Sequence, residues 1–293
     1  MRRRWTDLPL AVHDLIAERC GAVTAVTAPD AGEIAEFAAA VDTDADRVFV
    51  KAVRLDSPNL WMAHKEAQAA PAVQGIGARL RWQEQADGWL VTAFEYVPGR
   101  HADLSPDSSD LPLIAGTLAT LADRLTPAPA LRTLSLAQRW AGSALWPRIA
   151  AADGLTSWQA AHSDALVALE ARASEAVAGD TLAHTDMTAP NILVDGARVR
   201  IIDWSWPAPA AAWVDTASLV PRLIAAGHTV DRAHRWAMTV PHFAVAEPAK
   251  VAALASVTAA RWRLRAIQDG GPWLTLSVAA DLWAADLLAV GTS

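Results

Sequence analysis

The sequence has a single cysteine, Cys20, among its 293 residues. One cysteine cannot form an intramolecular disulfide, and no residue near Cys20 stands at the spacing of a metal site. The fold must therefore be stabilised by a hydrophobic core. Hydrophobic residues make up 53% of the chain and charged residues 19%, which excludes intrinsic disorder as the main state.

Basic residues are also few. Lys and Arg number 25 against 32 Asp and Glu, and the net charge of −7 has the wrong sign for a protein that wraps nucleic acid or lies on anionic lipid. We therefore expect no nucleic-acid partner. The only lysines are Lys51, Lys65 and Lys250, so the position of each one needs a reason.

Long apolar runs are missing as well. The uncharged stretch 204–214 is far shorter than the roughly 20 residues that a membrane-spanning helix needs. The arginines at 2–4 resemble the start of a signal peptide, but charged residues between 7 and 18 interrupt the apolar region that should follow. We expect a soluble, cytoplasmic protein without a membrane partner, either a monomer or a homodimer.

Hydrophobic periodicity divides the chain into two parts and predicts an α+β fold. A small β-rich lobe is expected over 1–97, a hinge and connection over 98–110, and a larger helical lobe with one embedded β-hairpin over 111–293. The small lobe is predicted to contain helices at 7–19 and 59–70 and strands at 22–27, 34–41, 47–53, 79–85 and 89–96. The helical lobe is predicted to contain helices at 111–125, 135–150, 157–176, 212–226, 247–268 and 274–289, with the hairpin strands at 192–194 and 199–202.

Two carboxylates and a carboxamide occur in and just after a polar loop: Asp186, Asn191 and Asp203. A tight loop and the end of the hairpin can bring such side chains to one point. Phosphoryl transfer needs this set, because one carboxylate orients and deprotonates the attacking hydroxyl while another carboxylate and an amide oxygen hold Mg²⁺ against the nucleotide phosphates. The alternative is that these are ordinary polar loop residues. That interpretation does not explain why the hairpin and Asp203 follow at the expected spacing.

The stretch from His184 to Asn191 resembles the H-x-D-x-x-x-x-N catalytic loop of the protein-kinase-like fold. The later Ile-Asp-Trp, which contains Asp203, resembles the version found in the aminoglycoside phosphotransferase and choline kinase family. This resemblance implies a two-lobed fold with a five-stranded antiparallel sheet in the small lobe, and ATP and Mg²⁺ as cofactors. It makes Asp186 the catalytic base, Asn191 a metal ligand, Asp203 the principal metal ligand and His184 a support for the loop.

The same fold implies a lysine in a central strand and a glutamate on the next helix. Lys51 stands in an apolar strand pattern, where an ammonium group without a partner would be costly. Glu66 follows on the inserted helix at the separation that the resemblance implies for the pair that positions the α- and β-phosphates. The competing interpretation is an edge-strand lysine that faces water.

Two further segments are candidates for nucleotide contacts. Gly32 lies between the first two predicted strands and Ala35 near the start of the second, where the resemblance implies a phosphate-covering loop, although Gly32 could equally make a simple hairpin turn. At the end of the fifth strand, the resemblance implies that Glu95 and Val97 contact the adenine edge through their main chains. A plain strand end with a Pro-Gly turn is compatible with the same residues.

Three residues near the loop have expected supporting roles. Asp215 is well placed as the N-cap of the helix over 212–226, and the resemblance adds that an Asp here often bonds the catalytic-loop backbone. Trp204 and Trp206 adjoin the expected metal site, so a ring of the acceptor could stack on them. The tryptophans of the predicted helices are expected in the core.

Together these features predict a kinase that transfers the γ-phosphate of ATP to a hydroxyl of a small molecule, such as an antibiotic, a natural product or a metabolite. One alternative is a catalytically weak nucleotide-binding partner protein, which the glycine-poor loop suggests. Another is a Ser/Thr kinase of a peptide natural-product precursor, although 204–214 is short for a peptide-docking platform. The acidic surplus is modest in residues 100–293, which disfavours a polycationic aminoglycoside as the acceptor.

Overall fold

The structure, a computed structural model, describes residues 3–29 and 35–290. Contacts divide the chain into two compact units. Unit 1 comprises Met1–Ala102 and Ala189–Pro207, and unit 2 comprises Asp103–Thr188 and Ala208–Ser293. The hairpin that follows the His184–Asn191 loop thus belongs to unit 1 by its contacts, while the lobe boundaries expected at residues 97 and 110 stay a prediction.

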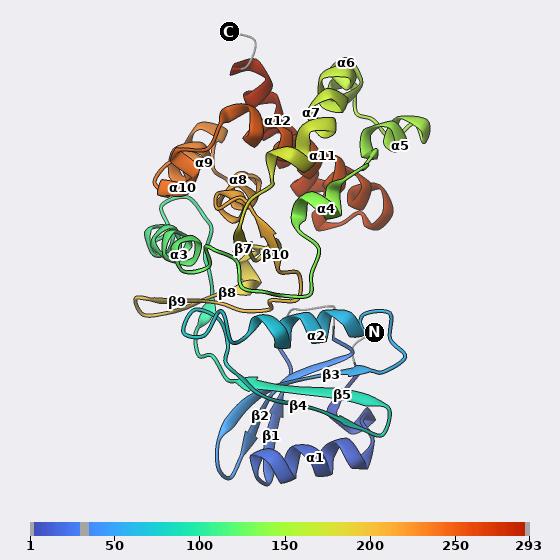
Figure 1. Cartoon of the computed structure of the whole chain (residues 1–293), viewed down its shortest axis with the longest axis vertical. Helices are drawn as coiled ribbons and strands as arrows, with labels where there is room; N and C mark the ends of the chain where they lie inside the picture. The colour runs from blue at the N-terminus through green and yellow to red at the C-terminus, as the bar shows by residue number, and fades with distance from the viewer. Residues whose placement is uncertain (1–2, 30–34, 291–293) are drawn as a thin grey trace. The chain divides into compact units, whose positions relative to one another are not determined.

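Five antiparallel strands form the main sheet of unit 1, in the order β1-β2-β3-β5-β4 (Figure 1). A short turn, η1 (Trp5–Asp7), and helix α1 (Leu10–Cys20) precede the sheet, and α2 (Leu60–Ala69) is inserted between β3 and β4. The five expected strands and the inserted helix are confirmed. The strands are β1 (Val23–Thr27), β2 (Phe37–Thr43), β3 (Arg47–Arg54), β4 (Leu80–Ala86) and β5 (Trp89–Glu95).

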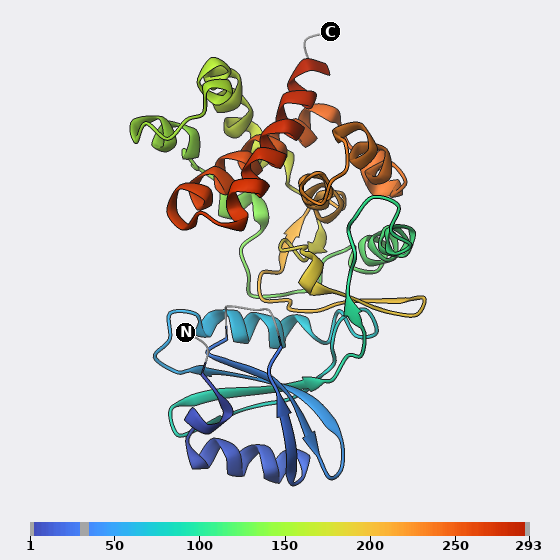
Figure 2. The ribbon, with the colours of Figure 1, turned by 180° about the vertical axis from the view of Figure 1, so that it is seen from behind.

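Alternation along the strands gives this sheet two different faces. Val48 and Val50 of β3 and Val91 of β5 are buried in a core that also contains apolar residues of α1. Helix α2 packs on the opposite face against β3 and β5 (Figures 1 and 2). Lys51 alternates with Val48 and Val50, so its side chain belongs to the α2 face. Because β3 lies between β2 and β5, Lys51 is not on an edge strand.

The predicted hairpin is part of a second sheet in unit 1, with the order β6-β8-β9. It consists of β6 (Arg100–His101), β8 (Ile192–Asp195) and β9 (Arg198–Ile201), and the turn η2 (Ala189–Asn191) precedes β8. The Ile202 N–H donates to the Asn191 carbonyl at 2.9 Å, and the Ile201 N–H donates to the Ile76 carbonyl at 2.8 Å. These bonds fix the backbone next to Asp203.

Unit 2 is mainly helical, with one antiparallel pair of short strands, β7 (Thr181–Ala183) and β10 (Ala208–Ala210). Its longest helix, α11 (Pro248–Asp269), packs against α7 and α12 (Figure 2). The other helices are α3 (Asp110–Arg124), α4 (Leu136–Trp140), α5 (Leu145–Ala151), α6 (Ser157–Ala161), α7 (Ser163–Ala176), α8 (Val214–Ala225), α9 (Val230–Ala237), α10 (Pro241–Ala244) and α12 (Pro272–Val290).

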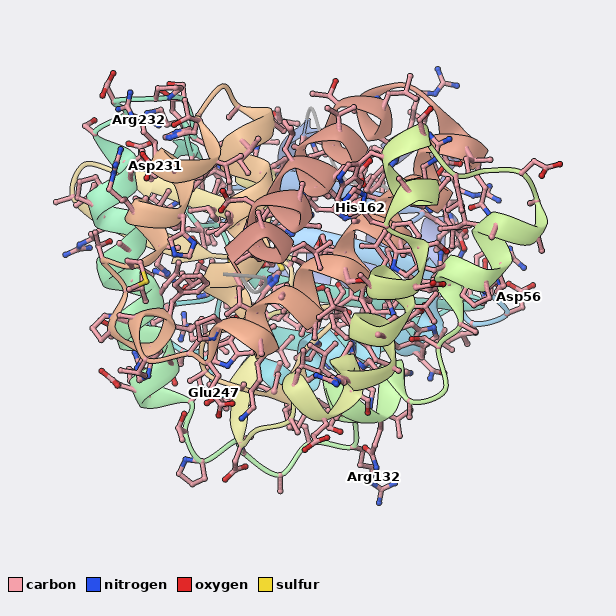
Figure 3. All side chains as sticks on the ribbon, turned by 90° about the horizontal axis from the view of Figure 1, so that it is seen from above. Asp56, Arg132, His162, Asp231, Arg232 and Glu247 are labelled. Carbon is pink, nitrogen blue, oxygen red and sulfur yellow. The ribbon has the colours of Figure 1, made fainter. Side chains whose placement is uncertain are left out.

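Two helices expected from periodicity are each broken into two in the structure. The segment 135–150 forms α4 and α5, with Gly142 at φ +69° between them. The segment 157–176 forms α6 and α7, which meet at His162 (Figure 3). Apolar spacing continues across both breaks, because it records which face is buried and not where the helical hydrogen bonds stop.

The short elements α9, α10, β6, β7 and β10 are not predicted from the sequence. Asp231 and Arg232 of α9 lie at the surface of unit 2 (Figure 3), where Arg232 forms an ion pair with Asp107 at 2.6 Å. A helix with so many charged residues has little apolar periodicity to detect. Within residues 3–29 and 35–290, every helix is too short or too polar to cross a membrane.

Candidate active site

The expected lysine–glutamate pair is present in unit 1. Lys51 Nζ donates to both carboxylate oxygens of Glu66, at 2.8 and 2.9 Å, and to Oδ1 of Asp203 at 3.1 Å. The Lys51 and Glu66 side chains are only 16% and 8% exposed. Lys51 comes from an interior strand, Glu66 from α2 and Asp203 from the segment after β9, so three distant parts of the chain meet at one ammonium group.

Burial and charge act against each other in this cluster. Burial opposes the charge on Lys51, but the carboxylates of Asp203 and Glu66 outweigh it and raise the Lys51 pKa. Burial also raises the pKa of Glu66 to about 7, although the Lys51 ammonium works in the opposite direction. The cluster therefore holds a firmly charged ammonium group inside the protein, where a charge interacts more strongly than in water.

These three residues line a cavity that is formed entirely within unit 1. One wall is the α2 face of the sheet, with Phe49, Thr92 and Phe94, and another is the strand-end segment from Glu95 to Gly99. Asn191 and Asp203 line the same cavity from the segments that flank the hairpin. An apolar slot with one ammonium group and several oxygen atoms at its end is suited to a ligand with a flat ring and an anionic tail.

Val97 and Glu95, at the end of β5, differ in their main-chain hydrogen bonds. Among the described residues, none accepts a hydrogen bond from the Val97 N–H, and the residue lines the cavity. Glu95 differs, because its N–H already donates to the Arg79 carbonyl at 2.9 Å. Its side chain forms a short ion pair with Arg200 of β9. The Glu95 carboxylate therefore ties the strand end to the hairpin.

Asp203 is held in a specific orientation. Its backbone has φ +62°, a left-handed conformation that an Asp tolerates better than most side chains. The Ser205 hydroxyl, which is buried and lines the cavity, donates a short hydrogen bond to Asp203 Oδ1. Sequence reasoning missed both Ser205 and Arg200, because nothing in their local patterns shows which side chains they will contact.

The two tryptophans after Asp203 have different surroundings. Trp204 is only 2% exposed, and its Nε1–H donates to the Ile201 carbonyl at 2.8 Å. The expectation that an acceptor ring could stack on Trp204 is therefore wrong, because the side chain is part of the core. Trp206 makes an edge-to-face contact with Trp61 of α2, with ring centroids 4.9 Å apart.

The loop that contains Asp186 belongs to unit 2, where it follows β7. Its turn is tight: Thr185 has φ +62°, and the Asp186 N–H lies 3.2 Å from His184 Nδ1. The Asp215 carboxylate accepts hydrogen bonds from the N–H groups of His184 at 2.7 Å and of Thr185 at 2.9 Å. A β-branched residue at positive φ is strained, so these bonds stabilise a backbone shape that the loop would not adopt alone.

Asp215 is not the N-cap of α8, because that position is Trp213 and Asp215 is the second helical residue. The N-cap prediction is thus wrong, while the backbone contact implied by the resemblance is observed. Burial raises the pKa of Asp215, and the His184 ring and the two N–H donors lower it. Asp215 therefore serves as an anchor that connects α8 to the Asp186 loop.

Comparison with known proteins identifies the family. The family model described as the phosphotransferase enzyme family matches residues 26–226, which is more than half of the chain. The chain belongs to this phosphotransferase family. The match covers every candidate site residue from Gly32 to Asp203, and it confirms the resemblance stated from the sequence. By family, the protein is a small-molecule phosphotransferase enzyme.

Solved structures similar to this phosphotransferase show its fold. A thermostable mutant of aminoglycoside phosphotransferase APH(4)-Ia, in a ternary complex with AMP-PNP and hygromycin B, has a TM-score of 0.65 and 14% identity over 97% of this chain and 99% of that chain. Choline kinase LicA from Streptococcus pneumoniae has a TM-score of 0.62 and 16% identity, over 95% and 98% of the two chains. The two-lobed α+β, protein-kinase-like fold is thus confirmed. No curated protein sequence matches the chain.

The phosphotransferase has an oxygen donor set that suits Mg²⁺. The Asp203 carboxylate and the Asn191 amide both line the unit 1 cavity, and hard oxygen atoms are the ligands that Mg²⁺ prefers. Among the described residues, no three His, Cys, Asp or Glu side chains form a metal-binding group. A Mg²⁺ ion would therefore be held by these two residues together with phosphate oxygens and water, which is its usual coordination in nucleotide sites.

Gly32, the expected phosphate-loop glycine, lies outside the described residues of the phosphotransferase. The residues on both sides of the gap, Pro29 and Ala35, line the cavity. The role of Gly32 therefore stays a prediction.

Proposed function

We propose that the chain is an ATP-dependent kinase that phosphorylates a hydroxyl group of a small molecule. The observation that carries this proposal is the buried Lys51–Glu66 ion pair, which lines one cavity together with Asp203. An interior ammonium group that two carboxylates keep charged is suited to nucleotide phosphates. The family match supports phosphoryl transfer as the reaction class.

We assign nucleotide binding to the cavity of unit 1. Lys51 would hold the α- and β-phosphates, and Glu66 would keep its ammonium group in place. The N–H of Val97, together with the carbonyl of Glu95, would contact the adenine edge through the main chain. Asn191 and Asp203 would hold Mg²⁺, which supplies positive charge against the phosphate oxygens and thereby stabilises the transferring group.

We assign the role of catalytic base to Asp186. Its carboxylate would accept the proton of the acceptor hydroxyl as the oxygen attacks the γ-phosphorus in line with the leaving diphosphate. The new P–O bond forms as the bond from the γ-phosphorus to the bridging oxygen breaks, so the products are a phosphorylated acceptor and ADP. Asp215 would support this step by holding the backbone at His184 and Thr185.

For the acceptor, we favour a hydroxyl compound that is not strongly cationic. Similar solved structures include complexes with hygromycin B and with spectinomycin, which shows what those proteins bind. This chain has only a modest acidic surplus in residues 100–293, whereas a polycation would require a strongly acidic pocket. A natural product or metabolite with few amines fits that charge better. The donor we propose is ATP, and GTP is the competitor to test, because another similar structure is described as a GDP complex.

The test is a nucleotide-consumption screen with Mg²⁺ and either ATP or GTP. The acceptors would be aminoglycosides, macrolides, nucleosides, amino alcohols and sugars, with mass spectrometry to detect the phosphorylated product. We expect acceptor-dependent product with ATP, none with Asp186→Asn, and loss of both product and nucleotide binding with Lys51→Met. Matched controls are Asp195→Asn, at the exposed end of β8, and Lys250→Met, a surface lysine of α11; both should behave like the wild type.

Two outcomes would contradict the proposal. If turnover survives in Asp186→Asn, the assignment of Asp186 as the catalytic base is wrong. Firm nucleotide binding without product from any acceptor class would favour the nucleotide-binding partner protein, and product found only with peptides would favour a peptide kinase.

A further inference from the structure

Helix α8 contacts the Asp186 loop at two places, and only one of them involves Asp215. Two helical turns further along, the Arg222 guanidinium approaches the side chain of Asp186, with Nη2 and Oδ1 3.9 Å apart. Asp215 thus binds the backbone just before Asp186, while Arg222 faces its carboxylate. The helix that shapes the loop also presents a positive charge to the proposed base.

Arg222 is an unusual arginine for its surroundings. Its side chain is 16% exposed, and among the described residues its Nε–H is buried without a hydrogen-bond partner. The guanidinium lies over the ring of Trp262, 4.9 Å from the centroid. Burial lowers the pKa of Arg222, and Asp186 is the acidic group that raises it. No other acidic side chain among the described residues forms an ion pair with it.

Burial of a guanidinium group with an unsatisfied donor is costly, so stability alone is a poor reason for an arginine at this position. Stacking on Trp262 explains how the guanidinium plane of Arg222 is oriented. A methionine or leucine would also pack on Trp262, without the cost of desolvating a charge. The nearby Asp186 carboxylate accounts for a positive charge at position 222. At 3.9 Å the guanidinium and the Asp186 carboxylate attract each other without the bidentate geometry of a close ion pair.

We propose that Arg222 is a positioning residue for phosphoryl transfer: it turns Oδ1 of Asp186 toward α8 and so fixes the orientation in which this carboxylate receives the acceptor proton. The inference rests on the proposed function, in which Asp186 is the base. Trp262 keeps the guanidinium plane in place, and Asp215 keeps the loop backbone in place. Arg222 acts through Asp186 and is not assigned any contact with the nucleotide or the acceptor.

The test compares Arg222→Met, which keeps the packing on Trp262 and removes the charge, with Arg222→Lys, which keeps a charge. For Arg222→Met we expect kcat to fall about 10- to 100-fold, as is typical of a misplaced catalytic group, with nucleotide affinity unchanged. Arg222→Lys should recover part of this loss. In the Asp186→Asn background, Arg222→Met should cause no further loss, because its effect requires the carboxylate.

A matched control is Arg261→Met. Arg261 also stacks on a tryptophan of unit 2, Trp140, at 5.2 Å, but its acidic neighbour is Glu170. This variant should leave kcat within about twofold of the wild type. Equal losses of kcat in both methionine variants, or full additivity with Asp186→Asn, would overturn the inference and indicate a structural role.

A readout that does not depend on turnover separates this inference from the proposed function. Amide hydrogen exchange at 184–186 should become faster in Arg222→Met and stay unchanged in Arg261→Met, because the loop loses a constraint only in the first variant. If the wild type phosphorylates no acceptor, the proposed function is wrong, but the exchange result still shows whether Arg222 constrains the Asp186 loop. If the wild type is active but exchange and kcat are unchanged in Arg222→Met, only the inference fails.

Discussion

Replacement of Asp215 by alanine should both destabilise unit 2 and impair the Asp186 loop. The change removes a buried carboxylate that accepts hydrogen bonds from the N–H groups of His184, at 2.7 Å, and Thr185, at 2.9 Å. His184 is fully buried, so water cannot easily replace the lost acceptor. A buried donor without a partner costs about 1–3 kcal/mol, so the buried His184 donor and the half-buried Thr185 donor together cost up to roughly 6 kcal/mol.

Two effects reduce this cost. Thr185, at φ +62°, can relax to an ordinary conformation once the carboxylate is gone, which returns about 1–2 kcal/mol. Burial also raises the pKa of Asp215, which shows that its charged form is costly to bury, and Asp215→Ala removes this desolvation cost. We therefore expect the free energy of unfolding to fall by about 3 kcal/mol. We expect kcat to fall more than tenfold, because the relaxation that lowers the cost also changes the shape of the loop.

The assay is urea unfolding, followed by fluorescence, together with kcat and nucleotide affinity. Asp215→Asn retains one acceptor oxygen, so its loss of stability should be about half of that in Asp215→Ala. Asp231→Ala is the control, because Asp231 is also an acidic residue in the first turn of a helix of unit 2, but it is exposed. A loss of stability in Asp215→Ala no greater than in Asp231→Ala would refute the reasoning. Weakened nucleotide affinity in Asp215→Ala would contradict the assignment of nucleotide binding to unit 1.

Three further predictions concern other parts of the molecule. Glu66→Gln should weaken nucleotide binding about tenfold in a calorimetric titration, because Lys51 loses a charged partner at 2.8 Å; an unchanged affinity would show that the pair is only structural. Burial raises the pKa of Asp281 to about 6 from an ordinary value of 3.8, so its contribution to stability is present below pH 3.8 and is lost as the pH rises through 6. Asp281→Asn should therefore be more stable than the wild type at pH 8, by up to about 3 kcal/mol, and by about half as much at pH 5, when both are unfolded with urea; an equal difference at both pH values would contradict this. Gly99→Ala should destabilise unit 1 in thermal unfolding, because φ is +131° and a Cβ atom would lie 2.9 Å from a β8 carbonyl oxygen. The control is Gly88→Ala, which should have a much smaller effect, because its φ is +78° and a Cβ atom would enter open space.

Much of unit 1 is predictable because its signals are local. The alternation in β3 and β5 specifies strands with two faces, and it places Lys51 on the face opposite to Val48 and Val50. The ion pair of Lys51 and Glu66 was predicted from the resemblance to the kinase-like fold, and it forms between one strand and the helix that follows it. The hairpin around Asp195 is equally local.

Longer-range contacts explain the predictions that were wrong. The N-cap role of Asp215 is a sound local inference, yet its carboxylate accepts hydrogen bonds from the N–H groups of His184, which is buried, and of Thr185, which is half-buried. Trp204 stands beside a site residue in the sequence, but its indole packs into the core and bonds to the Ile201 carbonyl. A residue next to a site in sequence can therefore point away from that site.

The order of residues in the chain thus specifies the strands, the inserted helix, the catalytic-loop motif and the family, because each depends on residue types at short separations. Tertiary structure alone decides that Arg200 binds Glu95, that Ser205 orients Asp203 and that Arg222 faces Asp186. Those contacts join side chains from separate elements. Their energies depend on burial and on distances of a few ångströms, and neither exists until the chain has packed.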